Sequence, residues 1–252
     1  MIALAFDLVD GARARLAAQH LVDNIEKHDW HLSTGFIGTK DLMLALAKIG
    51  RDDVAYRLIF QDTFPSWGFS IKQGATSIWE RWDGWTPQNG FQDPGMNSFA
   101  HYSFGAVYQW MVENIGGIRT DGPAYKHILI APQMNLKLTS DTTSYDSIRG
   151  RIKTAWQRSA DKLILDCTIP ANTTATAAGV RPACAANSAG SVAAATDRSG
   201  PFHSRRIVRR SAPPRMSSRP IERSGSATAA SSSRTRRPAS CSTLDRSNRS
   251  GR

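Results

Sequence analysis

Nearly all aromatic residues of this 252-residue chain lie before residue 177, and this distribution limits where a core can form. All seven Trp, all five Tyr and eight of the nine Phe lie in residues 1–176, Phe202 being the exception. Folding needs buried apolar surface to offset the entropy lost by ordering the backbone, so residues 177–252 are predicted to be disordered. The first 176 residues are long enough for one large domain or two smaller ones.

Net charge follows the same division. The chain has 32 Lys and Arg against 21 Asp and Glu, a formal charge of +11. Residues 177–252 hold 15 Arg, no Lys and three acidic residues, so the preceding part is close to neutral. A basic Arg/Ser tail can be a nucleic-acid-binding arm, but a tail with Arg and no Lys is also what a GC-rich gene yields in a shifted reading frame. We favour the shifted frame and expect no specific nucleic-acid partner.

The opening residues and the cysteines give no sign of export, membrane insertion or metal binding. Residues 1–8 lack a basic segment and contain an acid within a short apolar run, unlike a signal peptide or a membrane span. They are typical of the end of an amphipathic helix, and the cytoplasm is the default expectation. The three cysteines, Cys167, Cys184 and Cys241, lack metal-site spacing, so neither a zinc site nor a disulfide framework is predicted.

Helical periodicity dominates the first part of the chain and strand alternation the second. Apolar residues at helical spacing predict helices over about 14–27, 39–50, 52–60 and 98–115. Thr39 is the expected N-cap of the second helix, and Gly50 follows its C-terminus. Strands are predicted over about 126–130, 148–156, 162–169 and 169–176. Helices followed by antiparallel strands imply two segregated units, placed at residues 1–118 and 119–176.

A long irregular stretch, residues 61–94, contains four Trp within nineteen residues. Loops of this length inside a compact domain are usually functional. In this stretch Glu80 stands between Trp79 and Trp82, and a carboxylate can act as acid or base in glycoside hydrolysis while indole faces stack on sugar rings. The alternative is that the tryptophans are ordinary core residues and that Glu80 pairs with Arg81 or Arg57.

Four motifs occur in order along this part of the chain: His31–Thr39, Pro65–Gly68, Gly74–Trp82 and Met96–Tyr102. Together they resemble the C-terminal part of the bacterial α-L-rhamnosidases of glycoside hydrolase family 78, over essentially residues 1–176. The resemblance implies an all-α (α/α)6-barrel catalytic domain followed by an antiparallel C-terminal β-sandwich. It also implies inverting hydrolysis of terminal α-L-rhamnosyl residues from a glycoside or oligosaccharide, with no metal or organic cofactor and no membrane partner.

The resemblance implies roles for individual residues as well. Glu80 matches the general base, which activates water, and His101 matches a residue that hydrogen-bonds the rhamnose. His31 lies in a matching motif, where substrate binding and a loop-orienting role both remain open. The expected walls of the pocket are three tryptophans, Trp67, Trp79 and Trp82.

One expected part has no counterpart in this sequence. The family's general acid belongs to an Asp/Glu-rich motif in the first half of the barrel, and no such motif precedes residue 31. We therefore expect a fragment with a partial barrel and a partial sandwich that is inactive alone, because losing the acid costs ~10²–10⁴-fold in rate. Two alternative functions are nucleic-acid binding through the basic tail and sugar binding without catalysis.

Overall fold

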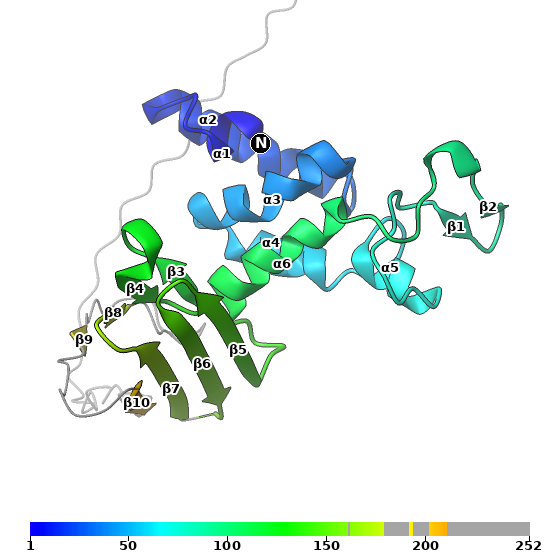
Figure 1. Ribbon diagram of the computed structural model, residues 1–252. Helices are drawn as coiled ribbons and strands as arrows, with labels where there is room; N and C mark the ends of the chain where they lie inside the picture. Colours follow the sequence, from blue (N-terminus) through cyan, green and yellow to red (C-terminus); the bar gives the residue numbers. More distant parts are fainter. Residues whose placement is uncertain (161, 179–191, 194–201, 211–252) are drawn as a thin grey trace, which may run out of the picture. The chain divides into compact units, whose positions relative to one another are not determined.

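The computed structural model describes residues 1–160, 162–178, 192–193 and 202–210 (Figure 1). Helices occupy residues 1–115, and most of the strands follow from residue 118. Within the described ranges, no helix is both long enough and apolar enough to cross a membrane.

Helices form where the apolar spacing predicts them, but two of them begin about one turn earlier. They are α1 (Ile2–Ala5), α2 (Gly11–Lys27), α3 (Phe36–Lys48) and α4 (Asp52–Ile59). The N-cap of α3 is Gly35 rather than Thr39, whose hydroxyl lies inside the helix and donates to the Gly35 carbonyl at 2.9 Å. The end of α3 is as predicted, because Gly50 adopts φ +74° and its N–H donates to the Ala47 carbonyl of the last turn.

The stretch between α4 and the sheets differs more from the prediction. The long loop contains α5 (Trp67–Lys72) and a small hairpin of β1 (Trp85–Thr86) and β2 (Gly90–Phe91), followed by the 3-10 turn η1 (Pro94–Met96). The predicted helix 98–115 begins only at residue 103, as η2 (Ser103–Ala106), α6 (Val107–Trp110) and the π-helical η3 (Met111–Ile115). Residues 98–101 are not helical, because backbone groups of Ser98 and His101 bond to those of Glu80 and Ile78.

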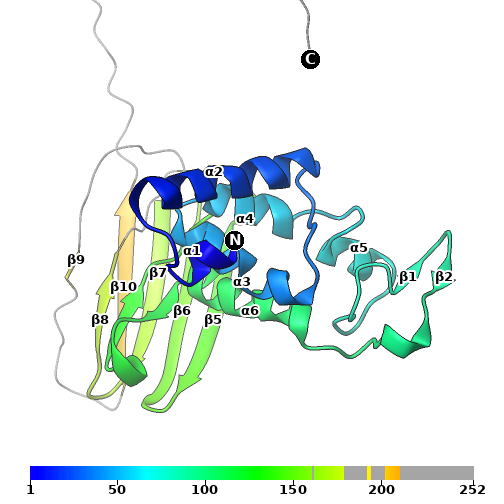
Figure 2. The same ribbon diagram turned by 90° about the horizontal axis from the view of Figure 1, so that it is seen from above.

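Two four-stranded sheets follow. The first has the order β10-β7-β6-β5 and is antiparallel, and Figures 1 and 2 show these strands side by side. The second has the order β3-β4-β8-β9 and is mixed, because β4 and β8 run parallel, in contrast to the wholly antiparallel arrangement expected. The strands are β3 (Ile118–Thr120), β4 (His127–Ile130), β5 (Ser140–Ser147), β6 (Gly150–Arg158), β7 (Lys162–Pro170), β8 (Thr174–Ala177), β9 (Val192–Ala193) and β10 (Phe202–Arg210), with the turn η4 (Pro123–Tyr125) before β4.

The predicted strands are found, one of them divided into two, and the strands β3 and β5 occur in addition to them. The strands predicted near 126–130, 148–156 and 162–169 correspond to β4, β6 and β7. The strand predicted over 169–176 is divided, since β7 ends at Pro170 and β8 starts at Thr174. The polar strand β5 is not foreseen, because its sequence lacks the apolar alternation that marks a strand.

Two strands fall in the stretch for which the sequence predicts disorder. β10 pairs antiparallel with β7, from Phe202 opposite Pro170 to Arg210 opposite Lys162, and β9 pairs with β8. The prediction of disorder therefore does not hold for these two segments. The rest of the predicted tail, residues 179–191, 194–201 and 211–252, lies outside the described residues, and the shifted reading frame stays a prediction.

A single hydrophobic cluster joins the helices to the sheets. It includes Trp110 of α6 and Trp156 of β6, which are 0% and 2% exposed. The Trp156 indole N–H donates to the Ile115 carbonyl, and the Thr154 hydroxyl donates to the Gly116 carbonyl, both at 2.8 Å. The last helical turn is thereby hydrogen-bonded directly to β6.

Candidate active site

Glu80 is held by a residue that lies eighteen positions further along the chain. The N–H of Ser98 donates to Oε2 of Glu80 at 2.8 Å, and the N–H of Glu80 donates to the Ser98 carbonyl at 2.9 Å. His101 lies beside this pair, with its Nε2 3.9 Å from Oε1 of Glu80. Both side chains are mostly buried, at 16% exposure for Glu80 and 23% for His101. The structure thus brings together two of the three polar residues that the sequence singles out, the third being His31.

The ring of His101 is fixed by aromatic neighbours. It packs against Phe36 with the centroids 5.6 Å apart and stacks on Tyr102 at 5.4 Å. Its Nδ1 accepts the Ser103 N–H at 3.4 Å. With Nδ1 as an acceptor, the neutral ring carries its proton on Nε2, the atom nearer to Glu80.

Glu80 lines a cavity of about 580 Å³. The other walls come from the segment 32–38, from Phe64 and Pro65, and from residues 81–83, 96 and 104. Two charged residues in this lining, Arg81 and Asp83, form a bidentate pair at 2.9 and 3.0 Å. This pairing lowers the pKa of Asp83 and raises that of Arg81.

The suggested ion pairs of Glu80 with Arg81 or Arg57 are not formed. Arg81 is paired with Asp83. The guanidinium of Arg57 lies 3.8 Å from the centroid of the Trp30 ring. The Glu80 carboxylate instead accepts a hydrogen bond from a backbone N–H, and no Lys or Arg in the described part of the chain forms an ion pair with it.

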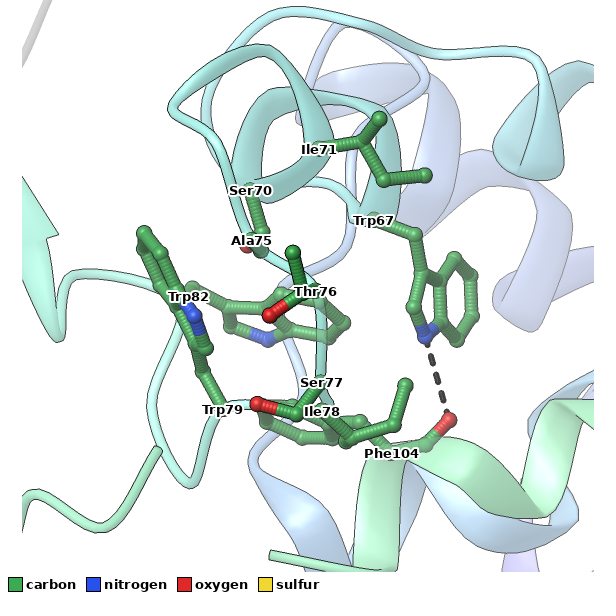
Figure 3. A pocket seen from close by; sticks show the side chains of 10 residues that line it. All are labelled: Trp67, Ser70, Ile71, Ala75, Thr76, Ser77, Ile78, Trp79, Trp82 and Phe104. Atoms are coloured by element: carbon green, nitrogen blue, oxygen red, sulfur yellow. Dashed lines mark hydrogen bonds between the residues drawn. The ribbon is translucent and has the colours of Figure 1, made fainter. Parts of the chain in front are cut away.

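Two of the three expected tryptophans, Trp67 and Trp82, form an aromatic cluster with Phe104, whereas Trp79 meets Phe99 edge-on at 5.1 Å. Trp82 stacks on Phe104 at 3.8 Å and meets Trp67 edge-on at 5.3 Å. The indole N–H of Trp67 donates to the Phe104 carbonyl at 3.1 Å, drawn as the dashed line in Figure 3. The indole N–H of Trp82 donates to the Thr34 carbonyl at 2.9 Å. These bonds fix both rings.

The cluster faces two cavities. Trp82 and Phe104 line both the Glu80 cavity and a second one of about 300 Å³. Trp67 and Trp79 line the second cavity, shown in Figure 3, and are only 8% and 7% exposed. Of the three tryptophans, Trp82 is therefore the one that lines the same cavity as Glu80, while the other two are largely packed side chains.

His31 connects two loops. Its Nδ1 bonds to the Asp29 carbonyl at 2.8 Å and its Nε2 to the Thr63 hydroxyl at 2.7 Å. Both ring nitrogens are occupied by these contacts, and His31 is not among the residues that line the Glu80 cavity. Of the two roles left open by the sequence, the structure favours loop orientation.

Sequence reasoning missed several contributors to this site. Ser98 acts through its backbone N–H, which has no side-chain signature, although it lies in a motif that was recognised. Phe36 and Phe104 likewise belong to or follow recognised motifs, but their contacts depend on tertiary packing. Among the described residues, no group of three or more His, Cys, Asp or Glu is arranged to hold a metal ion.

The chain matches two consecutive domain families. Residues 1–115 match the bacterial alpha-L-rhamnosidase 6 hairpin glycosidase domain, and residues 117–178 match the bacterial alpha-L-rhamnosidase C-terminal domain. An α-L-rhamnosidase of Streptomyces avermitilis is 46% identical to this chain over 175 residues, and one of Formosa agariphila is 42% identical over 175 residues. Each alignment covers 69% of this chain, but 17% and 19% of the relative.

Solved structures give the same relationship. The S. avermitilis α-L-rhamnosidase complexed with L-rhamnose aligns with a TM-score of 0.67 at 46% identity, over 69% of this chain and 17% of that chain. The Aspergillus terreus enzyme aligns with a TM-score of 0.68 at 31% identity, over 81% of this chain and 23% of that chain. The chain spans about a fifth of the length of the curated relatives it matches. Through residues 1–178, this chain belongs to the bacterial α-L-rhamnosidase family.

Proposed function

We propose that this chain carries the general-base side of an inverting α-L-rhamnosidase active site, with Glu80 as the base and His101 as a hydrogen-bonding partner of rhamnose. The observation that supports this most directly is that Glu80 lines an aromatic-walled cavity while its carboxylate lies 3.9 Å from Nε2 of His101, which is not itself part of this lining. The substrate would be a terminal α-L-rhamnosyl residue of a glycoside or oligosaccharide. The helices would form part of an (α/α)6 barrel, followed after about residue 118 by part of a β-sandwich.

The two carboxylate oxygens of Glu80 have different surroundings. Oε2 is engaged by the Ser98 N–H, whereas Oε1 is on the side of His101. A general base needs an ionised carboxylate with a free oxygen within hydrogen-bond reach of water. Oε1 is the oxygen suited to take the proton as water attacks the anomeric carbon, and Nε2 of His101 can donate to a sugar hydroxyl beside it.

The general acid is not supplied by the other carboxylate in the cavity lining. An inverting glycosidase needs a carboxylic acid ~6.5–9.5 Å from the base to protonate the leaving oxygen. Such an acid works when its pKa is raised. Asp83 has a lowered pKa because it accepts two hydrogen bonds from Arg81, so it is ionised at neutral pH. We therefore propose that the isolated chain does not hydrolyse rhamnosides.

The first test measures hydrolysis of a chromogenic α-L-rhamnoside by the purified full chain. The expected result is no turnover above the uncatalysed rate. Turnover that is abolished by Glu80→Gln would refute the proposed inactivity and establish the base. Turnover that persists in Glu80→Gln would refute the assignment of Glu80.

The second test measures L-rhamnose binding by NMR titration of backbone amides. His101→Ala is expected to weaken binding about threefold to tenfold, because one hydrogen bond is worth ~0.5–1.5 kcal/mol. His127→Ala is a matched control, since this histidine is held by the hydroxyls of Thr174 and Thr176 in the second sheet. Equal effects of the two substitutions would contradict the proposed sugar contact.

A further inference from the structure

We infer that Asn97 is a positioning residue for Glu80. Its side chain ties together the two ends of the segment 84–97, which contains β1, β2 and η1, and thereby fixes the Ser98 N–H against the Glu80 carboxylate. The inference deepens the proposed function and rests on the role of Glu80 given there. It concerns a residue that acts through another, because Asn97 is not among the residues that line the Glu80 cavity.

The Asn97 side chain joins three points of the backbone. Its Nδ2 donates to the Gly84 carbonyl at 2.9 Å and to the Gln92 carbonyl at 3.3 Å. The Gln92 N–H also donates to the Gly84 carbonyl, at 3.1 Å. Residues 84, 92 and 97 therefore meet at the two ends of the segment 84–97, which contains β1, β2 and η1.

The space around Asn97 is enclosed. Its Oδ1 is buried and has no hydrogen-bond partner among the described residues. A Cβ on Gly84 would lie 2.7 Å from this oxygen, closer than real Cβ contacts come. Burying an unpaired carbonyl oxygen costs free energy, so the two bonds donated by Nδ2 are formed against that cost. Gly84 is the residue type that allows Asn97 to occupy this position.

Ser98, the residue that follows Asn97, makes the contact to the proposed general base, Glu80. The Ser98 N–H reaches Oε2 of Glu80 at 2.8 Å, and the Ser98 carbonyl accepts the Glu80 N–H. Three residues later the His101 N–H donates to the Ile78 carbonyl at 2.8 Å, which places the histidine beside Oε1. A shift of the backbone at residue 97 would thus move both the Ser98 N–H that bonds Oε2 of Glu80 and the His101 ring that lies beside Oε1.

Amide hydrogen exchange of Ser98, measured by NMR on the full chain, tests whether Asn97 fixes the Ser98 N–H. Asn97→Ala is expected to speed Ser98 exchange about tenfold, which corresponds to ~1.4 kcal/mol of local protection. Gly84→Ala is expected to act in the same direction by displacing the Asn97 side chain. Asn135→Ala is the matched control, because Oδ1 of that residue caps a separate turn through the Lys137 N–H.

The chemical shift of the Ser98 amide proton separates positioning from a general loss of structure. Glu80→Gln removes the charged acceptor and should move this proton upfield in the wild-type background. In the Asn97→Ala background the same substitution should have a smaller effect, because the bond is already weakened. Ser98→Ala retains the N–H and should keep the wild-type response.

Two results would overturn the inference. One is unchanged Ser98 exchange in both Asn97→Ala and Gly84→Ala. The other is a full response of the Ser98 proton to Glu80→Gln in the Asn97→Ala background. If Asn97→Ala does not fold, Gly84→Ala carries the same two measurements. Results of the rhamnose and turnover tests that contradict the proposed function would leave this inference standing. The exchange rate and the chemical shift of the Ser98 amide depend neither on sugar binding nor on hydrolysis.

Discussion

Asp52 and Asp83 are carboxylates whose surroundings shift their pKa values in opposite directions. Asp83 accepts two hydrogen bonds from Arg81, which lower its pKa. Asp52, the first residue of α4, has its pKa raised by burial, and the nearby charge of Arg119 only partly offsets this effect. Oδ1 of Asp52 is buried without a hydrogen-bond partner in the described part of the chain. At neutral pH the fold therefore disfavours the charge of Asp52 and favours that of Asp83.

Asp52→Asn is expected to stabilise the protein at pH 7 by a few tenths to about 1 kcal/mol, because the substitution removes a partly desolvated charge. A pKa that is raised on folding makes the charged form destabilising, so the penalty is absent below the unfolded pKa and complete above the folded one. The gain should therefore grow as pH rises from about 4 to 7. Thermal unfolding of both proteins across this pH range measures it.

The neighbouring Asp53 is a control of opposite sign. Arg51 donates two hydrogen bonds to it at 2.8 and 2.9 Å, which lower its pKa. Asp53→Asn should destabilise the protein slightly at pH 7, and the effect should fade as pH falls through the lowered pKa. A gain from Asp52→Asn that is independent of pH would contradict the assignment to charge burial.

At the residue scale, sequence motifs identified the polar pair of the site but not what holds it. Glu80 and His101 lie in different motifs, and the structure places them 3.9 Å apart. The Ser98 N–H that engages Glu80 was not foreseen, because every residue except proline carries this group and only the fold selects one. The same reason applies to Trp67 and Trp79, whose largely packed positions depend on long-range contacts.

At the scale of elements, periodicity located the helices, while local hydrogen bonds determined their ends. The N-cap of α3 was misplaced at Thr39, because a Thr hydroxyl can bond a carbonyl inside a helix as well as cap one. The predicted helix from residue 98 was shortened to start at Ser103, since the backbone of Ser98 and His101 is used by the Glu80 segment. Both errors occur beside the candidate site, where tertiary contacts override local propensity.

Helix α5 supplies a second test at this scale. A Cβ on Gly68 would lie 2.2 Å from the Gln61 carbonyl oxygen and 2.9 Å from the Asp62 Cα, and both are backbone atoms that cannot easily move. Gly68→Ala should therefore displace α5 and destabilise the protein by ~1–3 kcal/mol. Denaturant unfolding followed by tryptophan fluorescence measures the change, because Trp67 begins this helix.

Ile71→Ala is the matched control for this prediction. Ile71 lies on the same helix but is 67% exposed, so its truncation should change stability by no more than about 0.5 kcal/mol. A Gly68→Ala protein as stable as the Ile71→Ala protein would show that α5 can move away from the preceding loop at little cost.

At the scale of the whole molecule, the distribution of large apolar residues predicted most of the ordered chain. It did not predict β10, because a strand at the edge of a sheet pairs through backbone groups, which no side-chain pattern marks. The division into units at residues 1–118 and 119–176 stays a prediction, and one buried cluster runs from Leu42 and Leu46 of α3 to Ile152 and Leu165 of the first sheet. A shared core of this kind makes separate unfolding of helices and sheets unfavourable.

Trp156 is the residue through which this coupling can be tested. Its indole is 2% exposed and donates to the carbonyl of Ile115, the last residue of η3. Trp156→Phe keeps an aromatic ring but leaves that buried carbonyl without this donor, and we expect a loss of ~1–3 kcal/mol. Because the side chain contributes to one continuous core, the loss should lower the unfolding midpoint of helices and strands together.

Circular dichroism at 222 nm, dominated by the helices, and the infrared amide I band of the sheets can follow the same thermal transition. In wild type and in Trp156→Phe the two midpoints should coincide and shift by an equal amount. Trp30→Phe is a suitable control, because Trp30 lies under the Arg57 guanidinium in the helical part and makes no hydrogen bond to a strand through its indole in the described structure. Midpoints that separate in Trp156→Phe, with only the sheet signal shifted, would mean that the helices fold independently of the strands and that the base-side site can form without them.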